Sequence, residues 1–374
     1  MDITWNHYYN VVYKISSVTG AWPYMKPGAR IFRLTILTIT MLTIFIPQIA
    51  YQSTCKKDIY CTFEASTSYL LTFAASLKVY TFQFNISTSK IPRSTKIMKS
   101  YAENSRRFSM IVLLNGDIYV YVYVSCTVRT RFHVALNQSR PVIPPYPGYY
   151  FVDVREYFLP IFCHSLVAWD ILMIGIMAHD CMYVTYVEHV CSLFAVTGHR
   201  FERLFYNDRN QLTEVVDRND MYYKRISFIV HTHRKSLKFA ELLEDTFTIP
   251  FAIQILIVTM GMSITLLQIS QENGPILEKI RYALYVIGQL IHLFLFSLEG
   301  QKLIDHSLQT REKIYNSSWY KASVRSQKLI MMVMIKCLRP SFLSAGKIYI
   351  FSLESFTTIL QTSMSYFTVL ASFQ

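Results

Sequence analysis

The clearest chemical pattern in this sequence is a set of hydroxyl side chains near its end. On a helix with about 100° per residue, these hydroxyls share one side with Val369. The full set within that side is Phe351, Ser355, Thr358, Thr362, Ser365, Tyr366, Ser372 and Phe373. The opposite side is wholly apolar and consists of Leu353, Phe356, Leu360, Met364 and Phe367. Such a stripe either packs against a neighbouring helix or lines water.

The order of residues along the stripe favours the water-lined interpretation. Hydroxyls occupy its earlier turns, and Val369 and Phe373 follow them. A polar vestibule followed by an apolar ring is the arrangement of a pore that closes by dewetting. One helix cannot enclose a pore, so a symmetric assembly with one copy from each subunit is predicted. The predicted pore and gate residues are Val369, Phe373, Ser372, Tyr366, Thr362 and Ser365.

Aromatic side chains gather in other apolar stretches, and they predict a ligand cavity. Tyr282 and Tyr285 share a helical face with Gln289. An apolar cavity with a few hydroxyls would hold a small hydrophobic ligand, although Tyr and Trp also serve as membrane anchors. The predicted ligand-binding residues are Tyr69, Phe73, Tyr119, Tyr121, Tyr123, Phe158, Phe162, Trp169, Tyr282, Tyr285 and Gln289.

Motifs for soluble chemistry are absent from the sequence. It contains no glycine-rich phosphate loop, no G-x-S-x-G, no C-x-x-C and no H-E-x-x-H. The nearest approach to a metal site is His231-Thr-His233, which lies in a basic run typical of a solvated helix. We therefore expect neither an enzyme nor a bound metal or cofactor.

Membrane-spanning helices must position these residues. The chain of 374 residues is 52% hydrophobic and only 16% charged. Three stretches carry no charge for 22, 25 and 20 residues, namely 34–55, 247–271 and 355–374. About 20 helical residues cross a bilayer. Together with four weaker blocks they predict an all-α membrane protein with seven transmembrane helices, at 33–53, 62–84, 108–128, 157–180, 247–270, 281–300 and 348–372.

The placement of Lys and Arg predicts the orientation. With the N-terminus in the cytoplasm, 28 of the 37 basic residues fall in cytoplasmic segments, as the positive-inside rule requires. The C-terminus is then extracellular, and the net charge of +13 reports orientation rather than binding to nucleic acid. No cleavable signal peptide is evident near the start.

Isolated features inside or between the spans carry weaker predictions. Lys78 is expected to extend its ammonium to the cytoplasmic side. Asp117 and Asp170 could pair with polar groups of other helices, and for Asp170 we favour packing. Cys55 and Cys61 share a short outer loop and are either paired or two exposed thiols. Asn137 is a candidate for glycosylation on the outer side.

The end of the chain resembles the closing signature of insect odorant receptors. The resemblance rests on the run from Arg339 to Leu370, on Trp319-Tyr320 and on the stretch from Gln289 to Gly300. The resemblance implies a tetrameric ligand-gated, non-selective cation channel in which odorant-binding subunits combine with a co-receptor subunit. It also implies a location in the plasma membrane of the dendrites of olfactory sensory neurons.

The resemblance also assigns roles along the chain. Val369 takes the gate position of the Tyr-Phe-x-Val stretch. Phe373 takes the next pore-facing turn, with Ser372 beside it. Tyr282 and Tyr285 match tyrosines of the family's ligand pocket. The implied regions are a cytoplasmic segment 1–32, helices one to four with an outer-half pocket at 33–180, a cytoplasmic loop with helix extensions at 181–246, helices five and six at 247–300, a cytoplasmic anchor at 301–347 and the pore-lining helix at 348–374.

Departures from the family pattern and rival functions bear on the assignment. The chain lacks the insertion and the ending of the co-receptor, which indicates a ligand-tuning subunit. Met364 stands where Tyr is frequent, and the ending differs from that of gustatory receptors. The rivals are a gustatory-type receptor, a seven-span receptor without a pore that signals through cytoplasmic partners, and a transporter, which the lack of internal repeats disfavours.

Overall fold

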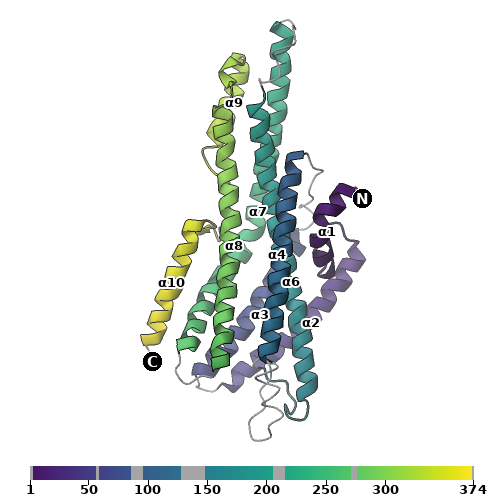
Figure 1. Cartoon of the computed structure of the whole chain (residues 1–374), viewed down its shortest axis with the longest axis vertical. Helices are drawn as coiled ribbons and strands as arrows, with labels where there is room; N and C mark the ends of the chain where they lie inside the picture. Colours follow the sequence, from purple (N-terminus) through teal and green to yellow (C-terminus); the bar gives the residue numbers. More distant parts are fainter. Residues whose placement is uncertain are drawn as a thin grey trace.

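The fold is a bundle of long helices with a short hairpin before the last of them (Figure 1). A computed structural model describes residues 3–55, 59–85, 96–127, 148–204, 215–270 and 276–372. The helices are α1 (Ile3–Val18), α2 (Pro27–Thr54), α3 (Ile59–Asn85), α4 (Lys96–Thr127), α6 (Phe158–Glu202), α7 (Val215–Ser270), α8 (Ile276–Tyr315), the 3-10 turn η3 (Trp319–Lys321), α9 (Val324–Lys336) and α10 (Leu353–Ser372), and the strands are β1 (Ser344–Ala345) and β2 (Tyr349–Ile350).

The long helices coincide with the predicted spans. Among the described residues, the seven helices of 20 residues or more are α2, α3, α4, α6, α7, α8 and α10. Within the same residues, α2, α6, α7 and α8 are each apolar enough over a sufficient length to cross a membrane. Several helices run past the predicted limits, because α7 has 56 residues and α6 has 45. Apolar stretches therefore mark where helices meet lipid rather than where they end.

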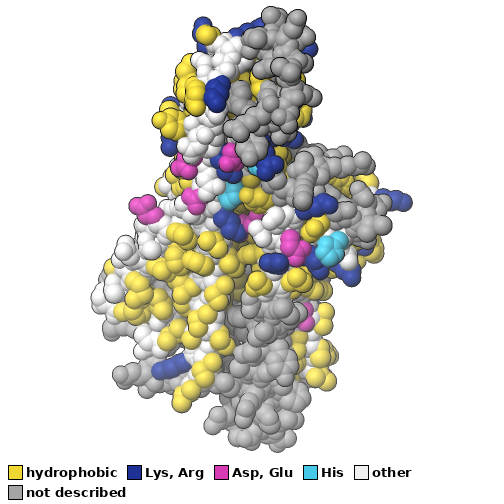
Figure 2. Space-filling view, turned by 45° about the horizontal axis from the view of Figure 1, so that its top comes forward, with side chains coloured by type: hydrophobic (Ala, Val, Ile, Leu, Met, Phe, Trp, Pro, Cys, Tyr) yellow, Lys and Arg dark blue, Asp and Glu magenta, His cyan; other side chains and the backbone are white. Residues whose placement is uncertain are grey.

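The two ends of the bundle differ, because α7, α8 and α9, together with the end of α6, extend beyond the other helices at the top of Figure 1. We name this the projecting end, and the opposite end, where the C-terminus lies, the far end. Figure 2 shows hydrophobic side chains covering much of the lower part of the visible face, with most charged side chains above them. The projecting end has its own core, in which Phe201, Ile226, Ile314 and Ile330 are fully buried.

The central core forms around α6, which packs against α4, α8, α7 and α3. Tyr183 on α6 stacks on Phe296 of α8 with ring centroids 4.6 Å apart. Phe251 of α7 meets Phe296 edge-on at 5.3 Å and Phe351 at 4.9 Å. Each edge-to-face ring pair adds about 0.5–1.5 kcal/mol beyond the buried area. This aromatic cluster therefore joins α6, α7 and α8 to the residue that leads into α10.

The β1–β2 hairpin anchors α10 to α7. Its turn has positive φ angles at Gly346 (64°) and Lys347 (61°). The backbone N–H of Gly346 donates to the carbonyl of Thr248 at 2.8 Å, and the N–H of Ser344 donates to a Glu244 carboxylate oxygen at 2.7 Å. The expected start of the last helix at residue 348 is wrong, because strand β2 occupies these positions and α10 begins at Leu353.

Candidate functional site

Helix α10 touches the rest of its own chain along a narrow edge. Only Ile359 and Ser363 of this helix are buried. Ser263 of α7 donates a hydrogen bond from its hydroxyl to the carbonyl of Ser363 at 3.1 Å, and Phe294 of α8 meets Phe356 with ring centroids 5.5 Å apart. The buried edge lies between the predicted hydroxyl stripe and the predicted apolar side. The apolar side takes part in the contact through Phe356, whereas the hydroxyl side chains of the stripe from Thr362 onward are exposed.

The predicted pore residues are exposed along α10. The exposed fraction is 53% for Val369 and 56% for Tyr366, and Thr362, Ser365 and Ser372 are exposed as well. Phe351 does not belong to this stripe, as it precedes the helix and is buried in the aromatic cluster. Phe373 lies outside the described residues. The structure therefore brings the described pore candidates onto one uncovered face.

Two predicted ligand-binding residues, Tyr69 and Phe73, line one cavity between α3 and α2. The cavity has a volume of about 470 Å³. Its lining is Phe45, Ile49 and Gln52 of α2 with Tyr69, Leu70 and Phe73 of α3. The three α2 residues are not evident as site residues from the sequence, because they lie in a charge-free stretch whose length indicates only a membrane span.

The other predicted ligand-binding residues lie in two separate groups. On α6, Phe158 and Phe162 are buried with ring centroids 5.7 Å apart, and Trp169 is buried further along the helix. On α8, the Tyr285 hydroxyl and the Gln289 amide share a hydrogen bond.

The α8 group faces α7, because Gln289 lies close to Gly261 of that helix. A Cβ atom added to this glycine would be 3.4 Å from the Gln289 amide nitrogen. Tyr282 is half-buried on the same helix. The side chains of Tyr119, Tyr121 and Tyr123 are outside the described ones. The aromatic residues that the sequence suggests thus do not form a single described pocket.

A buried ionic cluster joins α3, α6 and α8. The Lys78 ammonium of α3 lies 2.8 Å from Asp180 Oδ1 of α6. His292 of α8 contacts the second oxygen of Asp180 at 2.9 Å, and His179 contacts the first at 3.1 Å. Lys78 also sits 5.2 Å from the centroid of the Phe296 ring. The prediction that Lys78 extends to the cytoplasmic side is wrong, because its side chain is only 8% exposed and is paired.

This cluster is not evident from the sequence alone. Asp180 closes the predicted fourth span and His179 precedes it, so both were treated as a boundary. His292 interrupts an apolar run without a formal charge. Ionisable residues inside apolar segments are a signal of function or pairing. The signal was therefore present at Asp180 and His292, but the partners could not be identified without the fold.

Other isolated predictions have mixed outcomes. Asp170 is exposed on α6, so its expected packing within the chain is wrong. Cys55 and Cys61 form a disulfide, which selects the first of the two alternatives. The side chain of Asp117 and the whole of Asn137 lie outside the described residues.

The histidine pair does not form a metal site. His231 is exposed, whereas His233 is buried 3.4 Å from the Cys337 sulfur. Burial, with a smaller contribution from Lys336, lowers the pKa of His233 to about 4, so its ring is neutral at physiological pH. No group of three or more His, Cys, Asp or Glu side chains suited to a metal occurs within the described ranges.

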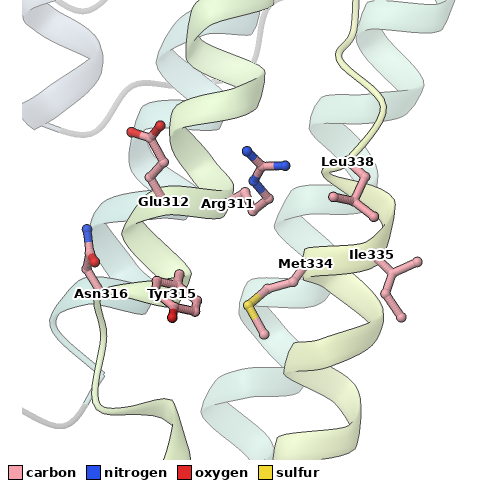
Figure 3. Close-up of a pocket in the computed structure, with 7 residues that line it drawn as sticks. All are labelled: Arg311, Glu312, Tyr315, Asn316, Met334, Ile335 and Leu338. Atoms are coloured by element: carbon pink, nitrogen blue, oxygen red, sulfur yellow. The ribbon is translucent and has the colours of Figure 1, made fainter.

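A second hollow lies between α8 and α9 at the projecting end, with a volume of about 360 Å³. Figure 3 shows its lining side chains, which are Arg311, Glu312, Tyr315, Asn316, Met334, Ile335 and Leu338. Large apolar side chains around it are exposed, including Met332 at 66% and Ile335 at 66%. Exposed apolar patches of this kind are typical of surfaces that contact another protein.

Comparison with known proteins gives consistent matches. A family model described as 7tm odorant receptor matches residues 80–364. Odorant receptor 13a of Drosophila melanogaster is 24% identical over 302 residues, which are 75% of this chain and 70% of that receptor. Odorant receptor 22c of the same fly is 25% identical over 52% of this chain and 48% of that receptor. The fly's odorant receptor coreceptor is 24% identical over 40% of this chain and only 31% of its own length.

Among solved structures, the fold matches the olfactory receptor OR5 of Machilis hrabei. The structure of that receptor in complex with eugenol has a TM-score of 0.80 at 14% identity, with 98% of both chains covered. A second structure of the same receptor gives a TM-score of 0.76 at 15% identity. At this level of identity the likeness establishes the fold alone.

Proposed function

Because the chain belongs to the insect odorant receptor family, a family of membrane receptors and not of enzymes, we propose that it is the odorant-binding subunit of a ligand-gated cation channel. Subunits of the related odorant receptor co-receptor complete the channel, which is a tetramer in the plasma membrane of olfactory neuron dendrites. The observation that carries the proposal is the uncovered face of α10. Hydroxyls on an apolar, membrane-length helix require either water or a partner, and a pore within a subunit assembly supplies both.

In the proposed orientation the projecting end is cytoplasmic and the far end is extracellular. The distribution of Lys and Arg supports it. The disulfide between Cys55, which directly follows α2, and Cys61, in the first turn of α3, supports it too, since disulfides persist in oxidising compartments such as the cell exterior. The N-terminus then lies inside and the C-terminus outside.

In the proposed mechanism a small apolar odorant binds in the extracellular half of the bundle. The predicted aromatic residues on α3, α4, α6 and α8 supply the contacts, and burial contributes about 25 cal/mol per Å² of apolar surface. Only a difference in affinity between the closed and open states can open the channel. The aromatic cluster of Tyr183, Phe251, Phe296 and Phe351 offers a packed connection from α6 and α8 to α10.

The gate at Val369 gives a direct test. We expect Val369→Ser to raise the resting current of cells that co-express the chain with the co-receptor, because a polar side chain keeps the constriction wet. Val369→Phe should lower the single-channel conductance. Met364→Ser, on the opposite side of α10, is the matched control and should change neither. Unchanged resting current and conductance in both Val369 variants would contradict the gate assignment. A separate recording distinguishes a channel from a receptor that signals through G proteins: a channel still gives a ligand-evoked current when G-protein signalling is blocked.

The apolar surface of α9 is proposed as a contact with neighbouring subunits. Met332 and Ile335 are each 66% exposed although the proposal places α9 in the cytoplasm, away from lipid. Met332→Glu with Ile335→Glu is expected to shift the solubilised complex from tetramer to smaller species in size-exclusion chromatography. Lys328→Glu, on the same helix, is the control for added negative charge and should leave the tetramer intact. A tetramer that survives the double substitution would exclude this contact surface.

A further inference from the structure

The seam between α2 and α3 is joined by polar side chains along most of its length. The Thr38 and Tyr80 hydroxyls are hydrogen-bonded, and the Ser76 hydroxyl donates to the Met41 sulfur at 3.5 Å. Towards the far end, Gln48 is 2% exposed and both ends of its amide are satisfied. Its nitrogen donates to the Ser68 hydroxyl at 2.8 Å, and its oxygen accepts from the Thr72 hydroxyl at 2.9 Å.

Gln52 lies one helical turn beyond Gln48 and breaks this pattern. Its Oε1 atom is buried and has no hydrogen-bond partner. The same residue lines the cavity of about 470 Å³ between the two helices. A buried acceptor without a donor is unfavourable, because it has lost its hydration and gained no hydrogen bond in exchange. The seam therefore ends in a hollow that contains one unsatisfied acceptor.

The rest of the lining is apolar or aromatic, consisting of Phe45, Ile49, Tyr69, Leu70 and Phe73. No lining side chain carries a formal charge, so a charged ligand would lose its hydration without a counter-ion. The volume falls within the range of about 300–1,000 Å³ typical of small-molecule sites. An apolar body of modest size with one neutral donor matches both the lining and the orphan oxygen.

We propose that this α2–α3 cavity binds a small neutral alcohol or phenol, whose hydroxyl donates a hydrogen bond to Gln52 Oε1. The inference rests on the proposed function in taking the ligand to be a small volatile molecule. It assigns Tyr69 and Phe73 to a cavity completed by α2 rather than by α4, α6 and α8, and it names a ligand class. The cavity uses α2, and it is separate from the group formed by Tyr285 and Gln289, which faces α7. Ethers, hydrocarbons and carboxylates of the same size bind this cavity less well.

The ligand reaches the cavity from the bilayer. Ile49 and Phe73 form its rim and are 50% and 40% exposed. Ile46 on α2 is also exposed, at 53%, which makes the surrounding surface lipid-facing. Medium-chain alcohols partition into membranes through their apolar chains. Concentration in the lipid thus supplies the ligand without an opening to water.

Photolabelling tests this inference without relying on channel current. The purified complex with the co-receptor is irradiated in the presence of a medium-chain alcohol that carries a diazirine group, and labelled peptides are mapped by mass spectrometry. Labels are expected on the α2 segment 45–52 and the α3 segment 69–73. Excess hexanol should compete, whereas hexyl methyl ether should compete about fivefold to tenfold less well, the effect of one net hydrogen bond.

Gln52→Leu removes the acceptor while keeping the shape. It should lower the affinity for the alcohol by about fivefold to tenfold and leave that for the ether unchanged. Gln268→Leu is the matched control, because Gln268 Oε1 is also buried without a partner but does not line the cavity; it should leave labelling unchanged.

Three results would each overturn the inference. They are labelling only outside 45–52 and 69–73, equal labelling in Gln52→Leu, and competition by sterol or phospholipid but not by hexanol. Specific labelling that Gln52→Leu weakens supports the site even if no odorant evokes a current, in which case only the proposed channel function fails.

Discussion

Replacing Lys78 with methionine is expected to destabilise the chain by about 3–5 kcal/mol, the typical effect of removing one partner of a buried ion pair. The Asp180 carboxylate is only 8% exposed and would lose its nearest full positive charge. His179 and His292 would remain within hydrogen-bonding distance of it. The unfolding temperature of the detergent-solubilised protein measures the effect.

A second substitution separates loss of charge from loss of packing. Lys78→Met combined with Asp180→Asn removes both formal charges, so the double variant should be more stable than Lys78→Met alone. Lys99→Met, at an exposed position on α4, is the control and should change stability by less than about 0.5 kcal/mol. A double variant no more stable than Lys78→Met would show that the ionic contact does not account for the loss.

Gly300→Ala is expected to destabilise the chain by about 1–3 kcal/mol and to abolish ligand-evoked current. A Cβ atom at this position of α8 would collide with the backbone carbonyl and the Cβ of Phe351, and overpacking has about this effect. The obstacle includes backbone, so a change of side-chain rotamer cannot relieve it. The hairpin and the start of α10 would have to shift, which disturbs the proposed pore.

Helix propensity predicts the opposite sign for this change, since Ala is favoured over Gly by about 1 kcal/mol inside a helix. Gly28→Ala provides the control. Gly28 lies in the first turn of α2, and a Cβ atom there meets nothing within 4 Å. We expect this control to be neutral or slightly stabilising, with normal current. An equally stable Gly300→Ala with normal current would show that α8 and Phe351 separate easily.

The helices were predictable because lipid imposes a simple constraint on sequence. A stretch without charge must be long enough to cross the bilayer and must satisfy its own backbone. This constraint located the seven long helices, and it gave no information on where they continue in water. Helix α7 extends back to Val215, far before its charge-free stretch, because polar and basic residues also form helix when another element covers one side.

The candidate site was less predictable, because it depends on which helix faces which. Tyr69 and Phe73 were selected as aromatic, but their cavity is completed by α2 and by Gln52. Lys78 was visible as an intramembrane charge, and only the fold pairs it with Asp180, 102 residues away. Periodicity predicted which side chains of α10 share a side, since periodicity is a property of one helix alone, and their role in a pore stays a prediction.

The hydroxyl groups of α10 have a further consequence for the ions that the proposed pore would admit. The Thr362 hydroxyl donates to the carbonyl of Thr358 at 2.8 Å, and the Ser365 hydroxyl donates to that of Gln361 at 2.9 Å. Ser372 likewise donates to the carbonyl of Val369 at 2.7 Å. With each hydrogen directed back into the helix, the oxygen lone pairs remain for the lumen. Between Thr358 and Ser372 a wall of this kind would be electronegative although that stretch contains no carboxylate. The proposed pore would therefore solvate Na⁺ and K⁺ alike and repel chloride.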